Sequence, residues 1–322
     1  HVLFLFTATW CYWLFINPHP LNLVAALGVA LAGVVLTLQP VRRQLLTRPV
    51  FRIFKHALPA MSDTERIALQ AGDTWWDAQL FTGKPNWHML LDVKTARLSE
   101  EEQAFLDGPV EQLCRMINDW EITHVHRRLP DHVWDFMRHQ RFFGMIIPRA
   151  YGGLEMSALA HSEVVMKLAS RSVSAAVTVM VPNSLGPAEL LLRYGTEQQK
   201  EYYLPRLASG IEIPCFALTG PEAGSDASSI PDTGIVCYGH FEGKEHVLGI
   251  QLNWRKRYIT LGPVATLLGL AFNLQDPHNL LGKGVEPGIT CALIPTNTQG
   301  IVIGNRHYPM NQAFQNGPNE GH

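Results

Sequence analysis

The sequence predicts an α+β protein in which an apolar front end is followed by a helical domain and then by a β-domain. Three observations predict this order. Two uncharged apolar stretches open the chain, helix-start motifs recur in its middle, and short apolar runs between Gly, Pro, Asp and Asn fill its last third. The expected segments are a membrane hairpin over 1–40, a connecting segment over 41–95, a helical domain over 96–212 and a β-domain over 213–322.

The front end contains two apolar runs, Val2–Ile16 and Leu21–Leu38, which Asn17-Pro18-His19-Pro20 separates. A helix needs roughly 20 apolar residues to cross a bilayer, so the second run qualifies, and the first would qualify if residues preceded it. We therefore expect a helical hairpin in a membrane. A signal peptide fits less well because no A-x-A-like site follows Leu38. A buried core helix is the remaining alternative.

Basic residues follow the second apolar run at once. Lys and Arg gather on the cytoplasmic side of membrane spans, so this cluster predicts that the soluble domains face the cytoplasm. Its members are Arg42, Arg43, Arg48, Arg52 and Lys55.

The helical domain is indicated by Ser or Thr followed three residues later by Glu or Gln, at Ser62–Glu65, Ser99–Glu102 and Thr196–Gln199. Apolar residues at helical spacing support it, and a helical pair broken near Gly195 is expected from Leu185 to Tyr203. The spaced apolar residues, which we interpret as core-facing, are Phe105, Val110, Leu113, Met116, Ile117, Val133, Trp134, Phe136 and Met137.

The β-domain is predicted as a small barrel or sandwich because its short apolar runs are closely spaced. The chain starts with His and residues 316–322 form a turn-rich segment, so we expect a fragment truncated at both ends. The expected strands are Pro214–Leu218, Gly234–Tyr238, Val247–Leu252, Tyr258–Leu261, Ala265–Phe272, Gly288–Ile294 and Gly300–Ile303.

The composition limits the classes of function that the chain can have. The chain has 322 residues, 47% hydrophobic and 17% charged, as in a globular protein with a sizeable core. A net charge of −2 gives no field that would hold nucleic acid, so no nucleic-acid partner is expected. The five cysteines form no CxxC pair, so neither a disulfide framework nor a metal site is indicated, and we interpret them as reduced thiols in a cytoplasmic setting.

The most informative stretch is Cys215–Asp226, where an expected strand enters a loop of small residues. Free backbone N–H groups and the hydroxyls of Thr219 and Ser225 can approach a polar ligand edge closely in such a loop. The loop suits the rim of a flat aromatic cofactor or a pyrophosphate. An ordinary surface turn is the alternative.

This stretch resembles the flavin-contacting signature of acyl-CoA dehydrogenases, and other landmarks of that family occur in order. The resemblance is closest to the long bacterial membrane-associated acyl-CoA dehydrogenases of fatty-acid β-oxidation, and it runs from about Arg48 to the end of the chain. The landmarks are Thr74-Trp75-Trp76, Pro148 with Tyr151-Gly152-Gly153, Pro182–Pro187, Gly195–Lys200 with Leu204-Pro205, Lys256–Thr260 and Phe314–Pro318.

The resemblance implies a helical domain, a middle β-domain and a C-terminal helical bundle, with FAD held between the last two and the bundle missing here. It implies that Ser225 contacts both flavin and acyl-CoA. The implied flavin contacts are Phe216, Leu218, Thr219, Gly224, Ser225, Tyr258, Ile259 and Thr260. The sequence departs from the family pattern at Gly220, Tyr258 and Leu261.

The implied reaction is α,β-dehydrogenation of an acyl-CoA thioester to the trans-2-enoyl-CoA, the first step of fatty-acid β-oxidation. No catalytic residue is assigned, because the resemblance puts the carboxylate base beyond His322, and Glu222 is interpreted as structural or solvent-facing. The expected partners are a medium- to long-chain acyl-CoA substrate and an electron acceptor. We expect the protein at the bacterial inner membrane and as a homo-oligomer. A membrane-tethered, non-catalytic flavin-binding module, an acyl-CoA oxidase and a DNA-associated relative are the alternatives.

Overall fold

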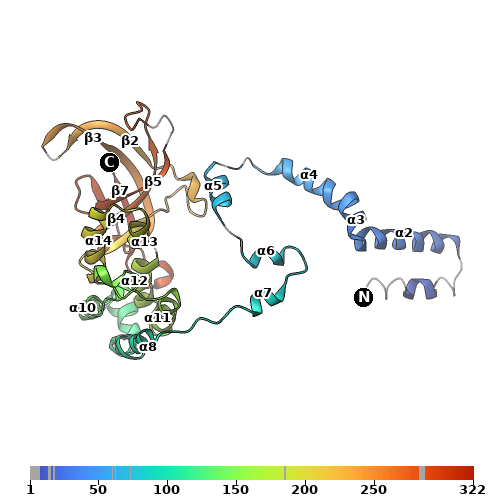
Figure 1. Cartoon of the computed structure of the whole chain (residues 1–322), viewed down its shortest axis with the longest axis horizontal. Coiled ribbons are helices and arrows are strands. Elements are labelled where there is room, and N and C mark those ends of the chain that lie inside the picture. The colour runs from blue at the N-terminus through green and yellow to red at the C-terminus, as the bar shows by residue number, and fades with distance from the viewer. Residues whose placement is uncertain are drawn as a thin grey trace. The chain divides into compact units, whose positions relative to one another are not determined.

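Two compact units make up the chain, His1–Trp75 and Trp76–His322 (Figure 1). The computed structural model describes residues 8–13, 16, 19–59, 61, 63–72, 74–184, 186–241, 243–282 and 287–322. Most of the first apolar run and the capping box that starts at Ser62 lie outside these residues. Within the first run, residues 8–13 and 16 are helical.

The first unit is helical over most of its described residues. Its longest helix starts at a Pro, and the ring of His19 accepts a hydrogen bond from the Leu21 N–H at 3.3 Å. Pro is favoured there because its missing N–H would have no partner in the first turn. The helical segments are α2 (Pro20–Thr37), α3 (Gln39–Arg42), η1 (Arg43–Thr47), α4 (Arg48–Ala57) and α5 (Asp63–Ala71).

Two described stretches are long and apolar enough to cross a membrane, Pro20–Thr37 and Val173–Tyr194. The first is 6% buried, whereas the second is 53% buried and contributes to the core of the second unit. An apolar helix near the start of a chain also fits a signal sequence. The membrane hairpin therefore stays a prediction.

The second unit starts with helices and ends with a sheet. Both described capping boxes are confirmed: Ser99 exchanges hydrogen bonds with Glu102, and Thr196 does so with Gln199. The helices are α6 (Asp77–Leu80), α7 (Trp87–Leu91), α8 (Glu100–Phe105), η2 (Leu106–Val110), α9 (Glu111–Met116), η3 (Glu121–His126), α10 (Asp131–His139), η4 (Phe142–Gly144), η5 (Arg149–Tyr151), α11 (Ala158–Arg171), α12 (Val173–Ser184), α13 (Ala188–Tyr194) and α14 (Glu197–Ser209).

Glu102 links two of these helices. Besides the Ser99 N–H, its carboxylate accepts the N–H of Ser157, the N-cap of α11, at 2.7 Å. The hydrogen bonds to the Ser99 and Ser157 N–H groups lower the pKa of Glu102 from 4.5 to about 2, because they stabilise the ionised form. One carboxylate therefore caps α8 and fixes the start of α11.

The strands form one curled sheet in the order β1-β4-β2-β3-β7-β6, with β5 also paired to β4. β1 and β2 run parallel to β4, and the other pairs are antiparallel. Among the described residues no pairing joins β5 to β6, so the expected barrel is seen only as a curled sheet. The strands are β1 (Pro214–Ala217), β2 (Thr233–Phe241), β3 (Lys244–Thr260), β4 (Leu267–Gln275), β5 (Gly288–Pro295), β6 (Ile301–Ile303) and β7 (Asn316–Gly321).

The structure corrects two details of the predicted strands. The strands expected at Val247–Leu252 and Tyr258–Leu261 are one strand, β3, which pairs with β2 over its first part and with β7 over its last. The turn-rich segment expected over 316–322 contains β7, which lies between β3 and β6. β3 therefore belongs to both halves of the sheet.

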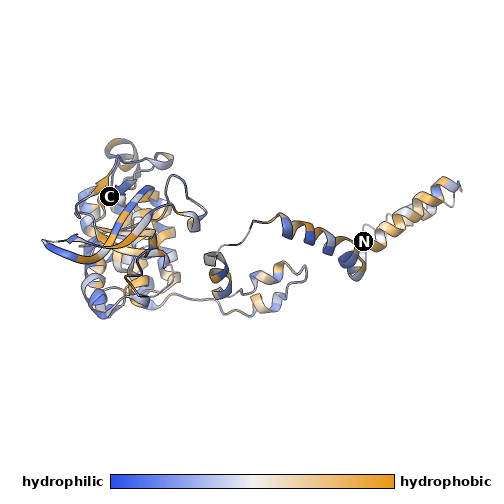
Figure 2. Ribbon diagram, turned by 90° about the horizontal axis from the view of Figure 1, so that it is seen from above, coloured by the Kyte–Doolittle hydropathy of each residue, from blue (hydrophilic) through white to orange (hydrophobic). Residues whose placement is uncertain are grey.

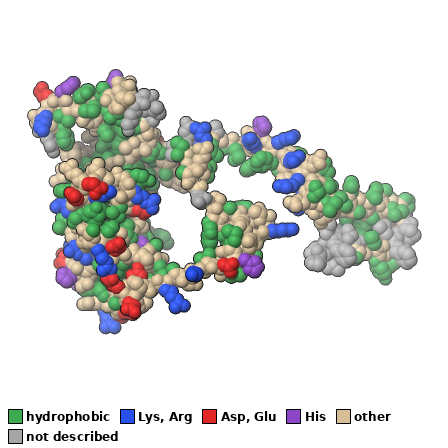
Figure 3. Space-filling view, viewed as in Figure 1, with side chains coloured by type: hydrophobic (Ala, Val, Ile, Leu, Met, Phe, Trp, Pro, Cys, Tyr) green, Lys and Arg blue, Asp and Glu red, His purple; other side chains and the backbone are tan. Residues whose placement is uncertain are grey.

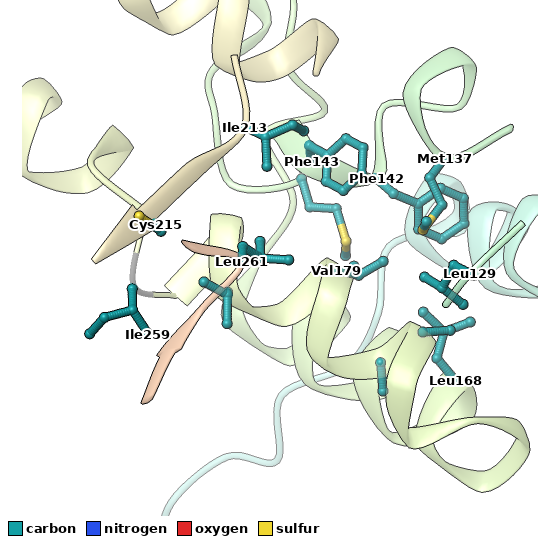
Figure 4. Packing of buried hydrophobic residues seen from close by; sticks show 14 of the residues in the cluster. Leu129, Met137, Phe142, Phe143, Leu168, Val179, Ile213, Cys215, Ile259 and Leu261 are labelled. Carbon is teal, nitrogen blue, oxygen red and sulfur yellow. The ribbon is translucent and has the colours of Figure 1, made fainter. Parts of the chain in front are cut away.

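The largest hydrophobic cluster of the described residues joins the helices to the sheet (Figure 4). Phe142, Phe143 and Val179 come from the helical region, while Cys215 comes from β1 and Ile259 from β3, and all five are buried. Close packing across this boundary fixes β1 and the end of β3 against η4 and α12. The loop after β1 is thereby held on a rigid base.

Candidate functional site

β1 carries Phe216 to the start of the loop. Phe216 is half-buried and lies opposite Gly269 of β4 in the parallel register. A Cβ at Gly269 would meet the Cys215 carbonyl oxygen at 3.3 Å, which is tight, and the Phe216 ring at 3.5 Å, which is ordinary contact. Burial raises the pKa of the neighbouring Cys215 thiol to about 12, so Cys215 is a neutral packing residue.

The loop closes on itself and then opens to the surface. The Gly220 N–H donates to the Ala223 carbonyl at 2.9 Å, and Ala223 is buried beneath this turn. Gly224 and Ser225 are exposed, and a Cβ at Gly224 would meet no protein atom within 4 Å. Nothing in the described fold therefore requires glycine at 224, whereas a ligand that approaches the backbone closely would. Glu222 is exposed, as predicted.

The hydroxyls of Thr219 and Ser225, two of the predicted ligand groups, have no hydrogen-bond partner within the described part of the chain. Thr219 is half-buried. The next acidic residue, Asp226, is already used by the protein: its carboxylate accepts from the N–H and hydroxyl of Ser228 and from the hydroxyl of Ser229. These hydrogen bonds, the Ser228 hydroxyl first, lower the pKa of Asp226.

The middle of β3 fastens the loop to the sheet. The Arg257 N–H donates to the Thr219 carbonyl at 3.0 Å, and the Lys256 ammonium donates to the Leu218 carbonyl at 2.9 Å. Lys256 also pairs with Asp232, and the two side chains are 0% and 3% exposed. Asp232 in turn accepts the Arg255 N–H at 2.8 Å. A fully buried ion pair thus sets the position of Leu218 and Thr219.

The end of β3 turns outward through a β-bulge. The pairing with β7 shifts between Lys256 and Ile259, and Tyr258 has a φ of +60°, which is uncommon for a residue with a side chain. Asn316 holds the bulge, because its side-chain amide donates to the Tyr258 carbonyl at 3.0 Å and the Thr260 hydroxyl at 3.2 Å. Bulges of this kind re-aim side chains, and here the re-aimed side chain is Tyr258.

The Tyr258 ring is 53% exposed and already has two neighbours. The Arg257 guanidinium lies 4.4 Å from its centroid and donates to its hydroxyl at 2.6 Å, while the His307 ring lies at 5.2 Å. Ile259 is 2% exposed and lies in the core, so its side chain is not available to a ligand. Thr260 is half-buried.

A cavity of about 730 Å³ lies beside Phe216. Helix α13 and its flanks form one wall, and β1, β4 and β5 form the other. Most lining side chains are apolar, as is usual for pockets that bind small molecules. The lining includes Leu190, Leu191, Tyr194, Phe216, Cys291 and Leu293.

Sequence reasoning missed three residues that shape this region: Asp232, Asn316 and His307. A signal for Asp232 was available, because Lys256 falls two positions after the apolar Trp254, on the same face of a strand. A lysine on an inward face requires a buried partner. Asn316 lies in the landmark Phe314–Pro318, which gave it no specific role, and His307 carried no comparable signal. Among the described residues, no three His, Cys, Asp or Glu side chains form a cluster that could hold a metal.

Residues 99–211 match the family described as "Acyl-CoA dehydrogenase, N-terminal domain". These residues therefore form a domain of the acyl-CoA dehydrogenase family. Within that family, the chain is 33% identical over 212 residues to the mitochondrial very long-chain specific acyl-CoA dehydrogenase of Mus musculus, which covers 64% of the chain and 31% of that relative. The chain thus spans about a third of this acyl-CoA dehydrogenase.

Solved structures show the same fold. The butyryl-CoA dehydrogenase from Megasphaera elsdenii is similar with a TM-score of 0.57 at 21% identity, over 71% of this chain and 57% of that one. A structure titled "FAD complex of PigA" is similar with a TM-score of 0.58 at 21% identity, over the same shares. At this identity the likeness establishes the acyl-CoA dehydrogenase fold alone.

Proposed function

We propose that this chain is the front part of an FAD-dependent acyl-CoA dehydrogenase, which converts an acyl-CoA thioester to the trans-2-enoyl-CoA in the first step of fatty-acid β-oxidation. The observation that carries the proposal is the loop from Leu218 to Ser225. It offers the hydroxyls of Thr219 and Ser225, which have no partner among the described residues, it is fastened to β3 by the buried Lys256–Asp232 pair, and it follows a domain of this family.

The residues present fit a flavin. Gly224 admits a close ligand, Thr219 and Ser225 offer free hydroxyls, and Tyr258 offers a partly exposed ring that can cover one face of a planar ring system. When bound, FAD would accept the hydride from the β-carbon of the substrate. The chain's own residues would orient the cofactor, with Phe216, Leu218, Gly224, Ile259 and Thr260 completing the set. The similar fold of a protein titled as an FAD complex supports this assignment.

The α-proton of the thioester requires a base, and the acidic residues of the loop do not fit that role. Glu222 is exposed, and nothing in the described fold desolvates it as a carboxylate base requires. We therefore place the base in sequence beyond His322. The partial coverage of the chain's relatives supports this, since it spans 57% of the solved butyryl-CoA dehydrogenase.

We assign the acyl group of the substrate to the cavity beside Phe216. Its volume of about 730 Å³ and its apolar lining suit a medium to long acyl chain, and Phe216 belongs to its wall and lies on β1, two residues before the loop that would hold the flavin. Ser225 would contact both flavin and substrate.

The protein is proposed to reside at the bacterial inner membrane, anchored by α2, with the second unit facing the cytoplasm. The uncharged α2 and the five basic residues that follow it support this orientation. An electron acceptor at the membrane would then reoxidise the flavin. A homo-oligomer is expected from the family resemblance alone.

The test is an anaerobic titration of the full-length protein, in detergent, with acyl-CoA of increasing chain length. We expect a flavin absorbance band that bleaches as enoyl-CoA forms, most completely with medium or long chains. A flavin that no acyl-CoA reduces would overturn the dehydrogenase and leave a tethered flavin-binding module. Fast reoxidation by O₂ would instead indicate an oxidase.

A further inference from the structure

A second helical stretch in the first unit exposes apolar side chains. η1 runs directly into α4, so residues 43–57 are continuously helical, and none of them is buried. Val50, Ile53 and Phe54 are 63%, 72% and 60% exposed. Such exposure over consecutive turns is unusual for a helix in water and marks an interaction surface.

The stretch is amphipathic. At about 100° per residue, Val50, Ile53, Phe54 and Ala57 fall on one side of α4, and the basic residues fall on the other. Leu46, Val50, Phe51 and Phe54 line a shallow groove along the apolar side. Figure 2 shows both hydropathy colours along α4, in contrast to the largely apolar α2.

The charge of this stretch has one sign. Residues 1–62 contain five Lys and Arg and no Asp or Glu. No ion pair involves Arg43, Arg48, Arg52 or Lys55 in the described part of the chain. Figure 3 shows basic and histidine atoms beside hydrophobic ones along α3 and α4. A second copy of this helix would repel it, whereas an anionic surface would neutralise it.

The position of α4 in the chain indicates what covers its apolar side. α2 ends at Thr37 and α4 starts at Arg48, with the short α3 and η1 between them. A helix of this length is marginal in water unless something covers its apolar face. If α2 spans a bilayer, α4 starts close to the bilayer surface, where apolar side chains enter the acyl region and Lys and Arg meet lipid phosphates.

We propose that η1 and α4 form an interfacial helix that lies on an anionic bilayer surface, with Leu46, Val50, Ile53 and Phe54 inserted and Arg48, Arg52 and Lys55 at the headgroup phosphates. This inference rests on the membrane location proposed above and not on the reaction. The helix would hold the enzyme at the leaflet richest in anionic lipid and limit how far the second unit moves from it.

The test is hydrogen exchange of residues 43–57 in the full chain, reconstituted in phosphatidylcholine nanodiscs with or without phosphatidylglycerol. We expect exchange to be about tenfold slower or more with the anionic lipid, because contact with the bilayer stabilises the helix. Equal exchange in both discs would overturn the proposal, and so would equal protection in detergent without lipid.

Two variants separate the contribution of the basic residues from that of the apolar residues, and a third is the control. R48Q/R52Q/K55Q keeps the apolar side and should abolish the difference between the two discs. V50S/F54S should exchange fast in both. K84Q/K94Q/R97Q makes the same charge change outside α4, at exposed residues, and should behave as wild type. Flotation with vesicles tests α2 separately: a chain that floats but shows no lipid-dependent protection refutes the interfacial helix and leaves the anchor standing. A chain that does not float refutes both.

Discussion

Lys256 and Asp232 form a buried ion pair beneath the loop that follows β1. Neither side chain is available to a substrate, so their effect on a ligand passes through the carbonyl of Leu218 and the backbone of Arg255. A buried pair of this kind contributes little net stability over apolar residues, yet removing one partner leaves an uncompensated charge. Its contribution here is the position of the loop.

Lys256→Met should therefore destabilise the protein by about 3–5 kcal/mol, because Asp232 stays buried without its cation. Lys256→Met/Asp232→Asn should lose less than the single variant, since the unpaired charge is gone. Urea unfolding of the three proteins measures this. A single variant as stable as wild type would show that the pair is not buried as described.

Glu102 predicts a pH dependence. The pKa of Glu102 is about 2 in the folded chain against an ordinary 4.5, so between these pH values the folded chain binds fewer protons at Glu102 than the unfolded chain does. The stability it contributes is fully present above pH 4.5 and is lost as pH falls toward 2. The melting temperature of Glu102→Gln should therefore lie below that of wild type at pH 6 and approach it toward pH 2. A difference that does not change with pH would contradict this.

At the scale of elements, a tight backbone turn explains why two of the landmark residues are glycines. The turn after η5 needs both glycines: Gly152 has a φ of +78°, and a Cβ at Gly153 would meet the Ile147 carbonyl oxygen at 2.0 Å. The Gly153 N–H donates to the Pro148 carbonyl, which closes the turn. The two glycines are therefore a structural requirement of the helical domain.

Gly153→Ala should cost about 1–3 kcal/mol, as overpacking against a rigid backbone does. Gly249→Ala is the matched control, because a Cβ there meets no atom within 4 Å. Thermal unfolding compares the two. If both variants melted together, the close approach of Ile147 to Gly153 would be wrong.

The sequence predicted most helices because capping boxes and apolar spacing act locally. It failed at β7, whose residues Asn316-Gly317-Pro318-Asn319-Glu320-Gly321 have low strand propensity. β7 forms because of tertiary contacts: Asn319 accepts the Trp254 indole N–H, and a Cβ at Gly321 would meet the Trp254 ring at 2.0 Å. Such contacts between distant segments leave no local pattern.

β3 was divided in the prediction for a related reason. Its polar centre, from Asn253 to Arg257, resembles a loop when read by hydropathy, but Trp254 and Lys256 point inward there. The loop after β1 was predictable because small residues follow a short apolar strand. The contact of Lys256 with this loop was not predictable, because Asp232, the partner of Lys256, lies 24 residues from it in sequence.

At the scale of the whole molecule, the chain consists of two compact units. The first has apolar and basic helices without acidic residues up to position 62, and the second has a rigid core that presents the loop, the bulge at Tyr258 and the cavity beside Phe216. The proposed membrane location belongs to the first unit and the proposed chemistry to the second. The claim that joins the fold to the chemistry is that the loop from Leu218 to Ser225 holds FAD.

The most direct test of that claim is the affinity for FAD of Gly224→Val in the full-length protein, with Gly239→Val as control. A Cβ at either position meets no protein atom within 4 Å, so both variants should keep the wild-type melting temperature of the apoprotein. We expect Gly224→Val to bind FAD about tenfold more weakly or worse, because its side chain occupies space that the ligand needs. Equal FAD affinity in both variants would contradict a flavin site at this loop.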